Sequence, residues 1–467
     1  MEKVAVIILA AGQGKRMHSG LAKVLHPLLG KPMLGYPLEV TLENLHPEKT
    51  LVVIGHQGEE ILAFFSDPRI TFVEQEEQLG TGHAVSVVEP ILGKFKGTLL
   101  ILCGDIPLIQ AQTLRAMLNH HWEKDATITL LTATMEDPTG YGRVVRGVLG
   151  GVRKVIEEKD SKDPEREIKE INSGIYCVQS PFLFHALKQL KSDNFQGEYY
   201  LTDIIEIAHH EKQKICTYSP ADPWEIFGLN TRAHLAKAEE ILHERVRQRW
   251  MSDDVTIQDP KSVYIETDVR IGRDTIIYPN CYLCGKTSIG EGCQIGPQVE
   301  IRDSQIGDRV RIRFCTLITE STIEDDSTVG PFTHLRPLTH LEKGVSIGNF
   351  VEVKKSRIRK GTKANHLSYI GDSDVGEAVN IGAGTITCNY DGYQKHQTII
   401  EDGVFVGSNT ALVAPVKIGK RALVGAGATI TKDVAPFALA VSRPKQKNIK
   451  KWVIKRDKKR AKENQRD

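Results

Sequence analysis

The sequence lacks a long hydrophobic run and an excess of charge of one sign. The longest apolar run near its N-terminus, residues 4–11, has eight residues, whereas a membrane span needs about 20. No charged region precedes this run, so we expect neither a membrane span nor a signal peptide there. The 61 Lys and Arg residues nearly balance the 59 Asp and Glu residues. This balance argues against a protein that mainly wraps nucleic acid or coats an anionic membrane, and we expect no nucleic-acid partner and no membrane insertion.

Cysteine is also scarce, with eight residues scattered over 467, which excludes a disulfide-rich scaffold. Cys281 and Cys284 form one Cys-x-x-Cys pair, but the second pair of ligands that a zinc site needs is missing. We therefore expect these two to be small, half-buried side chains of a repeat. This cysteine usage favours a reducing compartment, and we expect a cytoplasmic protein.

One segment departs from the overall charge balance. Residues 443–467 contain twelve Lys and Arg against three Asp and Glu, a net charge of +9. Because the whole chain carries +2, the rest of it carries −7. Such a basic tail can bind phosphate groups, but a solvated and poorly ordered terminus is the more common case.

The most regular feature of the sequence is a six-residue repeat. From about Val263 onward an aliphatic residue recurs every six positions, with a few steps of five and one long interruption before Ile400. Glycine often follows the aliphatic residue, as in Ile271-Gly272 and Val424-Gly425. The repeat positions are Ile265, Ile271, Ile277, Leu283, Ile289, Ile295, Ile301, Ile306, Ile312, Ile318, Ile323, Val329, Leu335, Leu341, Ile347, Val353, Ile358, Ala364, Ile370, Val375, Ile381, Ile400, Val406, Leu412, Ile418, Val424 and Ile430.

A period of six matches neither an α-helix nor a hairpin strand. It predicts short strands separated by corners, three sides to a turn, in which each aliphatic side chain stacks on its equivalent one coil below. Glycine tolerates the backbone angles of tight corners. The pattern resembles the hexapeptide-repeat family, whose members fold as left-handed parallel β-helices and usually assemble as trimers. The resemblance implies a homotrimer formed through the β-helix.

Before the repeat, apolar strands alternate with segments long enough for helices. We expect strands at residues 4–9, 51–54 and 98–102, and the alternation predicts an α/β domain with a mixed, mostly parallel, Rossmann-like sheet. In such sheets ligands bind beyond the carboxyl ends of the strands. Helical spacing without Gly or Pro predicts a connecting helix next. The predicted parts are an α/β domain over 1–231, a linker helix over 232–252, and a β-helix domain with its basic tail over 253–467.

The first predicted strand leads directly into a glycine-rich loop, Ala10-Ala11-Gly12-Gln13-Gly14-Lys15-Arg16-Met17. The unhindered N–H groups of such a turn bind anions, and two cations stand beside it. The loop lacks the Gly-Lys-Ser/Thr ending of a Walker A loop, and Met17 replaces the third glycine of a dinucleotide fingerprint. Asp105, at the end of a later strand, has its carboxylate where a hard Mg²⁺ ion would be held. Alternatively, Asp105 caps the helix that follows Pro107.

Several of these motifs together resemble a known family. The segment Leu9-Ala10-Ala11-Gly12 with Gly14, Arg16 and Lys23 is similar to the signature of sugar-nucleotide pyrophosphorylases. More closely, the whole chain resembles the bifunctional N-acetylglucosamine-1-phosphate uridyltransferases/glucosamine-1-phosphate acetyltransferases. The matching N-terminal segments are Gln75 with Gln78-Leu79-Gly80-Thr81-Gly82-His83, Cys103-Gly104-Asp105, Gly140-Tyr141-Gly142-Arg143, Ile156-Glu157-Glu158-Lys159, Glu170-Ile171-Asn172-Ser173-Gly174 and Gly228-Leu229-Asn230.

The resemblance implies a role for each matching residue of the first domain. Uracil and ribose of UTP would be held by Leu9, Ala10, Ala11, Gly12, Gln75, Gly80 and Thr81, and Gly104 would also bind the nucleotide. The sugar pocket would be lined by Gly142, Glu157 and Asn172. Mg²⁺ would be bound by Asp105 and Asn230, while Arg16 and Lys23 would contact the triphosphate and assist the reaction. At position 103 the family commonly has tyrosine, so no contact is carried over to Cys103.

Polar clusters also lie off the repeat positions of the β-helix segment. The three clusters are Leu335-Arg336-Pro337, Asn349-Phe350-Val351-Glu352-Val353-Lys354-Lys355 and Lys363-Ala364-Asn365-His366-Leu367-Ser368-Tyr369. Ala364 holds the inward position, so His366, two residues later, need not be a core residue. The period then lapses until about Ile400, which predicts a loop leaving the coil, and such loops often carry binding residues.

These clusters, with Asn380-Ile381-Gly382-Ala383-Gly384, Val406-Gly407-Ser408, Gly425-Ala426-Gly427 and Val441-Ser442-Arg443, match the acetyltransferase half of the same family. By this resemblance His366 would be the general base that takes a proton from the glucosamine amine. The glucosamine phosphate would be bound by Arg336, Lys354, Tyr369 and Asn380. Acetyl-CoA would be contacted by Ala383, Asn389, Tyr390, Ser408, Ala426 and Arg443. Cys388 is a weaker candidate for a nucleophile, because an amine with a positioned base needs no covalent acyl-enzyme.

The resemblance therefore implies a two-step enzyme that uses acetyl-CoA, UTP and Mg²⁺. It would acetylate glucosamine 1-phosphate and then transfer UMP to the product, giving pyrophosphate and UDP-N-acetylglucosamine, a precursor of peptidoglycan and lipopolysaccharide. A first alternative is a single-activity pyrophosphorylase whose β-helix only oligomerises or regulates, which the His366 cluster and the Asn389-Tyr390 segment argue against. A second is a non-enzymatic β-helical scaffold with a nucleotide-sensing domain and a docking tail. A scaffold needs no metal-binding pair such as Asp105 and Asn230, which argues against this alternative.

Overall fold

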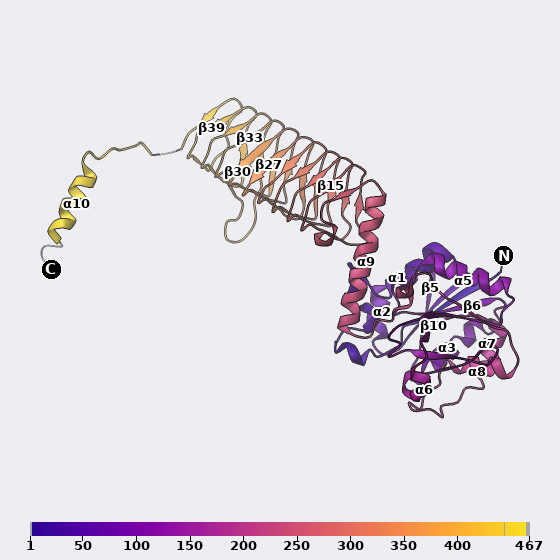
Figure 1. Cartoon of the computed structure of the whole chain (residues 1–467). Helices are drawn as coiled ribbons and strands as arrows, with labels where there is room; N and C mark the ends of the chain where they lie inside the picture. Colours follow the sequence, from indigo (N-terminus) through magenta and orange to yellow (C-terminus); the bar gives the residue numbers. More distant parts are fainter. Residues whose placement is uncertain (1, 443, 464–467) are drawn as a thin grey trace. The chain divides into compact units, whose positions relative to one another are not determined.

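The computed structural model describes residues 2–442 and 444–463 and separates into two compact units, residues 1–245 and 246–467. Each unit has its own architecture (Figure 1), an α/β fold in the first and a coil of short strands in the second. Within the described residues, no helix combines the length and the apolar character needed to cross a bilayer.

The first unit is built on a nine-stranded mixed sheet with the order β11-β7-β10-β6-β1-β4-β5, to which β8 and β9 are attached beside β10. Strands β1, β4, β5 and β6 are parallel, whereas β10 runs antiparallel to both of its neighbours in this order. The strands are β1 (Val4–Leu9), β4 (Lys49–Ile54), β5 (Ile70–Glu74), β6 (Thr98–Cys103), β7 (Ile128–Thr134), β8 (Gly142–Arg146), β9 (Val152–Ile156), β10 (Glu170–Gln179) and β11 (Ile215–Tyr218). The mixed, mostly parallel sheet predicted from the sequence is confirmed.

Helices and short turns connect these strands. The helices are α1 (Gly35–Glu39), α2 (Gly58–Phe64), α3 (Thr81–Ser86), α4 (Glu89–Leu92), α5 (Ala111–Glu123), α6 (Asp163–Arg166), α7 (Ser180–Leu187) and α8 (Asp203–His210). A small hairpin of β2 (Pro27–Leu28) and β3 (Lys31–Pro32) lies between β1 and α1 in sequence.

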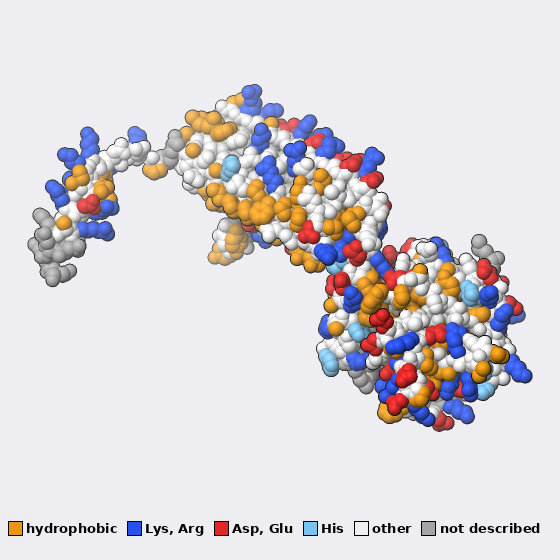
Figure 2. All heavy atoms as spheres, viewed as in Figure 1, with side chains coloured by type: hydrophobic (Ala, Val, Ile, Leu, Met, Phe, Trp, Pro, Cys, Tyr) orange, Lys and Arg blue, Asp and Glu red, His pale blue; other side chains and the backbone are white. Residues whose placement is uncertain are grey.

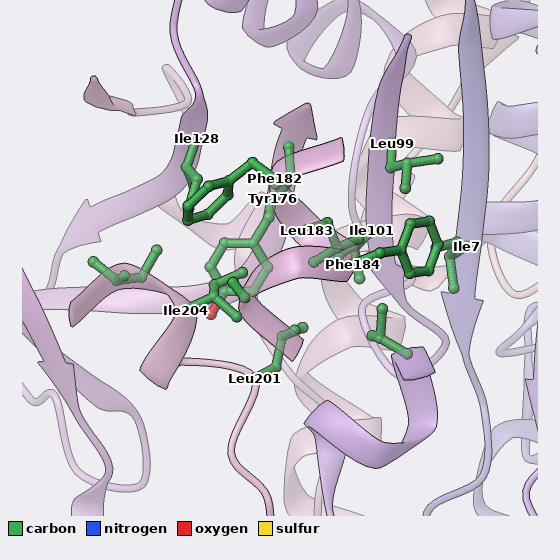
Figure 3. Close-up of a cluster of buried hydrophobic side chains, with 14 of the residues drawn as sticks. Ile7, Leu99, Ile101, Ile128, Tyr176, Phe182, Leu183, Phe184, Leu201 and Ile204 are labelled. Atoms are coloured by element: carbon green, nitrogen blue, oxygen red, sulfur yellow. The ribbon is translucent and has the colours of Figure 1, made fainter. Parts of the chain in front are cut away.

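The core of this unit lies on both faces of the sheet. Along β1 the side chains alternate, so that Ile7 belongs to one buried cluster and Ile8 to the other. Figure 3 shows the first cluster, in which Phe184 of α7 lies beside Ile7 and Phe182 of the same helix lies beside Ile128. A strand that is buried on both faces consists of consecutive apolar residues. This is why β1 can be recognised in the sequence.

The helix α9 (Arg232–Ser252) follows the sheet, and the division into two units falls inside it, after Arg245. In the first unit, Arg245 fastens this helix to the α/β domain. Its guanidinium donates to the backbone oxygen of Leu108 (2.7 Å) and to Asp222 (3.0 Å).

The second unit is a β-helix of three parallel sheets, each strand pairing with the strand one coil away (Figure 1). The first sheet contains β12 (Thr256–Ile257), β15 (Ile276–Ile277), β18 (Gln294–Ile295), β21 (Arg311–Ile312), β24 (Thr328–Val329), β27 (Ser346–Asn349), β30 (Lys363–His366), β33 (Asn380–Ile381), β36 (Phe405–Val406), β39 (Leu423–Val424) and β41 (Leu439–Ala440). The second contains β13 (Tyr264–Ile265), β16 (Tyr282–Cys284), β19 (Glu300–Arg302), β22 (Leu317–Thr319), β25 (His334–Leu335), β28 (Glu352–Lys354), β31 (Tyr369–Gly371), β34 (Ile386–Cys388), β37 (Ala411–Val413) and β40 (Thr429–Ile430). The third contains β14 (Arg270–Ile271), β17 (Ser288–Ile289), β20 (Gln305–Ile306), β23 (Ser321–Ile323), β26 (Thr339–Leu341), β29 (Arg357–Ile358), β32 (Ser373–Val375), β35 (Thr398–Ile400) and β38 (Val416–Ile418).

The repeat positions form the interior of this coil. From Ile265 to Ile430, each predicted inward position is at most 7% exposed, and each pairs in register with its equivalent, as Ile347 does with Ala364. Cys281 and Cys284 are 0% and 6% exposed, so both are buried rather than half-buried. All eight cysteines are free thiols. The basic tail includes a helix, α10 (Trp452–Glu463).

Candidate functional site

The glycine-rich loop begins where β1 ends. Gly14 has a φ of +59°, and a Cβ atom there would stand 2.6 Å from Cβ of Lys23. Only glycine fits both this left-handed backbone conformation and this close approach. Gly14 therefore allows the loop to fold back against the segment that carries Lys23.

Four polar side chains from distant parts of the first unit meet beside this loop. The ammonium of Lys23 donates to Oδ2 of Asp105 (2.5 Å) and to Oδ1 of Asn230 (2.9 Å). The guanidinium of Arg16 donates to the same Asn230 oxygen (2.7 Å). The backbone N–H of Leu229 donates to the carbonyl of Asp105 (2.9 Å), which fixes the Asn230 segment against the end of β6. Asp105 does not cap a helix, because α5 begins at residue 111 after an N-cap at Gln110.

The oxygen atoms of Asp105 and Asn230 form a donor set suited to a hard cation. Both are within hydrogen-bonding distance of one positive group, the Lys23 ammonium. Mg²⁺ is usually held by one or two carboxylates together with substrate phosphates, so one carboxylate and one carboxamide are an adequate protein contribution. Across residues 2–442 and 444–463, no group of three or more His, Cys, Asp and Glu side chains is placed to hold a metal by itself.

A cavity of about 550 Å³ opens beside this cluster, a size typical of small-molecule sites. Nine of its lining residues are predicted ligands of the nucleotide or the metal: Leu9, Ala10, Ala11, Gly12, Lys23, Gln75, Gly80, Thr81 and Asp105. The other lining residues are Gln13, Gly14, Val24, Gln78, Ala84, Cys103, Lys159 and Glu198. The predicted uracil and ribose residues thus come together around one hollow.

Two polar side chains of this cavity are held in place by their own partners. Gln75 is buried, and its amide nitrogen donates to the carbonyl of Gly80 (3.2 Å) and contacts Nδ1 of His83 (3.0 Å). The hydroxyl of Thr81 accepts the backbone N–H of Leu201 (3.0 Å). These contacts fix the start of α3 at the edge of the cavity.

The three predicted sugar-pocket residues lie on neighbouring strands. Gly142 of β8 pairs with Asn172 of β10, and Glu157 follows β9, which pairs with β8. The amide nitrogen of Asn172 donates to the hydroxyl of Tyr176 (2.7 Å), while its buried oxygen has no partner in the chain. A buried acceptor without a partner is costly, so this oxygen is available to a ligand.

Burial raises the pKa of two groups at this end of the sheet. It raises the pKa of the Glu157 carboxyl, although the hydroxyl of Thr202 donates to it (3.0 Å) and opposes the shift. Burial also raises the pKa of the Cys103 thiol, which stays protonated and contacts the carbonyl of Gly174 at 3.5 Å. Cys103 therefore lines the cavity with an uncharged thiol. Because the thiolate is the reactive form, Cys103 is not expected to act as a nucleophile.

In the β-helix, the predicted phosphate-binding side chains occupy successive coils. Arg336 follows β25, Lys354 ends β28 and Tyr369 begins β31, and these three strands are neighbours in the second sheet. The guanidinium of Arg336 donates to Glu352 (2.8 Å). The pKa of Lys354 is lowered, chiefly by the ammonium of Lys395 beside it. Two facing cations favour the binding of an anion between them.

His366 is exposed at the end of β30, while Ala364 fills the interior below it. Its Nδ1 lies 3.1 Å from Oδ1 of Asn349, the residue paired with it one coil away. An amide oxygen only accepts, so Nδ1 carries the hydrogen and Nε2 has a free lone pair. Asn380 lies in β33, the next strand of the same sheet.

The predicted loop leaves the coil between β34 and β35 (Figure 1). Asn389 at its base is buried and donates to Asp372 (2.6 Å) and to the hydroxyl of Tyr369 (3.4 Å). Tyr390 is exposed, and further along the loop Nε2 of His396 contacts the carboxylate of Asp391 at 2.7 Å. The loop thus connects the predicted acetyl-CoA residues with the predicted phosphate-binding tyrosine.

The other predicted acetyl-CoA residues form a column along the coil. Ala383, Ser408 and Ala426 follow the same corner in successive coils, where Asn409 N–H donates to Ala383 and Gly427 N–H donates to Ser408. Arg443 was assigned to the same ligand and lies outside the described residues.

Some residues of these two sites have no role predicted from the sequence. No role is predicted for Asn349 and Lys395, nor for the cavity residues Gln78, Lys159 and Glu198, although Asn349, Gln78 and Lys159 lie in segments that match the family. Asn349 could have been identified from the sequence, because it precedes His366 by 17 residues. This spacing is about one coil, so the two residues are expected to lie side by side. For Lys395 there was none, because the six-residue period does not extend into the loop.

Known proteins match both parts of the chain. The nucleotidyl transferase family matches residues 5–231, and the bacterial transferase hexapeptide (six repeats) family matches residues 268–303 and 397–432. The bifunctional protein GlmU of Geotalea uraniireducens is 48% identical over 457 residues, which cover 98% of this chain and 100% of the relative. The protein of that name from Geotalea daltonii is 50% identical over 456 residues (97% and 100%), and that from Pelobacter propionicus is 48% identical over 460 residues (98% and 100%).

Proposed function

This chain belongs to the family of bifunctional GlmU proteins, and we propose from its two sites that each unit catalyses one of two consecutive steps in the synthesis of UDP-N-acetylglucosamine. The β-helix acetylates glucosamine 1-phosphate with acetyl-CoA. The α/β domain then transfers UMP from UTP to N-acetylglucosamine 1-phosphate and releases pyrophosphate. The observation that carries this proposal is the presence of a separate polar cluster in each unit, around Asp105 in one and around His366 in the other.

In the first domain, charge neutralisation and alignment matter more than base catalysis. The phosphate of the sugar is already an anion, so its oxygen can attack the α-phosphorus of UTP without losing a proton to a base. The bond from that phosphorus to the bridging oxygen breaks, and pyrophosphate leaves. Arg16 and Lys23 lie beside the cavity and neutralise phosphate charge. Asp105 and Asn230 would hold Mg²⁺, which adds further positive charge when bound.

Within the sugar pocket, the free oxygen of Asn172 and the protonatable Glu157 offer hydrogen bonds to the sugar. They bring the sugar phosphate to the side of the cavity that holds Lys23 and Asp105. Holding both reactants in one geometry removes much of the entropic cost of the reaction.

In the β-helix, His366 takes a proton from the glucosamine amine as it attacks the thioester. The new carbon–nitrogen bond forms, the carbon–sulfur bond breaks, and the leaving CoA thiolate takes up the proton held by His366. Asn349 holds Nδ1–H of His366, so Nε2 faces the amine as the base. Arg336 and Lys354 bind the sugar phosphate, and the column of Ala383, Ser408 and Ala426 contacts acetyl-CoA.

The two half-reactions are expected to proceed independently in one purified protein. Thiol should be released from acetyl-CoA and glucosamine 1-phosphate without UTP. Pyrophosphate should be released from UTP and N-acetylglucosamine 1-phosphate with Mg²⁺ and without acetyl-CoA. Both can be followed by separate colorimetric assays. Pyrophosphate release with no thiol release under any condition would leave a single-activity pyrophosphorylase.

We also propose that three copies of the chain assemble through the β-helix. Phe332 and Phe350 stack one coil apart with ring centroids 5.2 Å apart, and they are 45% and 54% exposed. Leu367 continues the column, and Figure 2 shows hydrophobic side chains gathered along one side of the β-helix. A monomer seldom exposes such a surface, and closed cyclic symmetry would cover it in every copy. Subunits packed side by side would also deepen the shallow wall around His366.

A Phe350→Glu substitution tests this assembly. The wild-type protein is expected to sediment at the mass of three chains, independent of concentration. The variant should shift toward one chain and lose acetyl transfer, because the second site needs a neighbouring wall. Its uridylyl transfer should remain. A wild-type protein that sediments as one chain would contradict the trimer.

We place the protein in the cytoplasm. Its eight cysteines are free thiols, as suits a reducing compartment, and UTP and acetyl-CoA are cytoplasmic substrates. Cell fractionation followed by the pyrophosphate assay tests this assignment, and activity confined to a periplasmic extract would contradict it.

A further inference from the structure

A charged side chain is buried beneath the predicted sugar pocket. Arg143, in β8, is 2% exposed, although it carries a full positive charge. One of its terminal nitrogens lies 2.8 Å from the carboxylate of Glu158, a contact between charges that is not aligned as a hydrogen bond. Its other terminal nitrogen donates to the backbone carbonyl of Tyr141. The guanidinium therefore joins two segments that are 17 positions apart in the chain.

Both of these segments carry predicted sugar-pocket residues. Tyr141 immediately precedes Gly142, and Glu158 immediately follows Glu157. Arg143 itself pairs with Ile156 across β9 and with Ile171, next to Asn172, across β10. Arg143 thus lies where the strands that carry Gly142 and Asn172 meet the strand that ends just before Glu157.

Tyr141 extends the same connection toward the predicted metal site. Its hydroxyl accepts the backbone N–H of Gly228 at 3.3 Å. The side chain of Asn230 bonds back to the carbonyl of Gly228 (3.4 Å), and Leu229 between them is bonded to Asp105. A continuous path of contacts therefore runs from Glu158 through Arg143 and Tyr141 to the segment that carries Asn230.

The stability of the fold alone does not explain why this path of contacts includes a buried ion pair. A buried ion pair is often no more stabilising than apolar side chains of the same volume, because both charges lose their hydration. A guanidinium is rigid and planar, so it sets the distance between the Glu158 carboxylate, which it contacts as a charge, and the Tyr141 carbonyl, to which it donates. We therefore expect Arg143 to contribute more to the relative placement of the two segments it joins than to the stability of the fold.

We propose that Glu158, Arg143 and Tyr141 form a strut that fixes the sugar pocket relative to Asn230, and that Arg143 is a positioning residue for uridylyl transfer. This proposal rests on the function proposed above, because it takes Asn172 and Glu157 as sugar ligands and Asn230 as a metal ligand. The strut keeps the attacking sugar phosphate at a fixed distance from the cations that neutralise the triphosphate.

The same strand offers a matched control. Arg146 is also paired with a glutamate, Glu170, through two contacts of 2.6 and 2.7 Å, but it is 37% exposed, whereas Arg143 is buried. We expect Arg143→Met to raise the KM for N-acetylglucosamine 1-phosphate by about 10-fold or more, with a smaller change in the KM for UTP. Arg146→Met should leave both values near wild type. Acetyl transfer should be unchanged in both variants.

Two further variants keep the test decisive if Arg143→Met folds poorly. Glu158→Gln retains the arginine and its shape but removes the opposite charge at a partly exposed position, and it should also raise the KM for the sugar phosphate. Tyr141→Phe removes only the acceptor for Gly228 N–H, so it should raise the Mg²⁺ concentration needed for half-maximal uridylyl transfer. Calorimetric titration with N-acetylglucosamine 1-phosphate measures the sugar site without any reaction.

An Asn172→Ala variant distinguishes a failure of the proposed strut from a failure of the proposed sugar pocket. If Asn172→Ala leaves the affinity for the sugar phosphate unchanged, the assignment of the sugar pocket is wrong. If Asn172→Ala weakens binding while folded Glu158→Gln and Arg143→Met bind like wild type, the pocket stands and the strut is overturned.

Discussion

An Asp105→Ala variant is expected to lose uridylyl transfer by about 100-fold or more, a loss typical of removing one preorganised electrostatic group from an active site. Lys23 donates to both Asp105 and Asn230, and among the described residues Asp105 is the only carboxylate in this cluster. Its removal takes away a predicted Mg²⁺ ligand and leaves the Lys23 ammonium with Asn230 but without its charged partner. The measurement is pyrophosphate release from UTP and N-acetylglucosamine 1-phosphate at several Mg²⁺ concentrations.

The matched control for this variant is Asp163→Ala in the same unit. The Asp163 side chain is 98% exposed and makes only a long contact of 3.7 Å with Arg166. Its removal should leave uridylyl transfer near wild type, and both variants should keep acetyl transfer. Full uridylyl transfer by Asp105→Ala would remove Asp105 from the reaction.

A His366→Ala variant is expected to lose acetyl transfer by about 100- to 10,000-fold, the usual contribution of a positioned general base. The imidazole is exposed at the end of β30, so its loss leaves no cavity in the core and should not unfold the coil. The measurement is thiol release from acetyl-CoA with glucosamine 1-phosphate. Uridylyl transfer with supplied N-acetylglucosamine 1-phosphate should be unchanged.

Another histidine of the β-helix provides the control. His340 contacts Glu324 at 2.8 Å, lies in the third sheet and has no predicted role. His340→Ala should acetylate like wild type. Asn349→Ala, which frees Nδ1 of His366, should reduce acetyl transfer less than His366→Ala and should alter its pH profile, because the preferred tautomer is lost. Undiminished thiol release by His366→Ala would exclude His366 as the base.

The β-helix could be predicted almost completely from the sequence, because its order is local. An inward position such as Ile347 needs only its own repeat and the one a coil away to become buried. The strands β1 and β6 could be predicted for a similar reason, since a run of apolar residues buried on both faces is visible in any short window.

The contacts within the sites could not be predicted in this way. Arg16 and Asn230 are 214 positions apart, and nothing near either residue indicates the other. Their assignment came from the family resemblance, and their hydrogen bond appears only in the folded chain. The burial of Arg143 is a similar case, because arginine in a strand is usually exposed and its partner Glu158 lies across a turn.

The central claim is that two separate sites in one chain act in sequence, and mixing two variants tests it most directly. Asp105→Ala and His366→Ala proteins are each supplied with glucosamine 1-phosphate, acetyl-CoA, UTP and Mg²⁺, first separately and then together, and UDP-N-acetylglucosamine is quantified by chromatography. Each variant alone should form almost none. The mixture should form it, because one protein makes N-acetylglucosamine 1-phosphate and the other consumes it. A mixture that remains inactive, or either variant forming the product alone at the wild-type rate, would contradict the account.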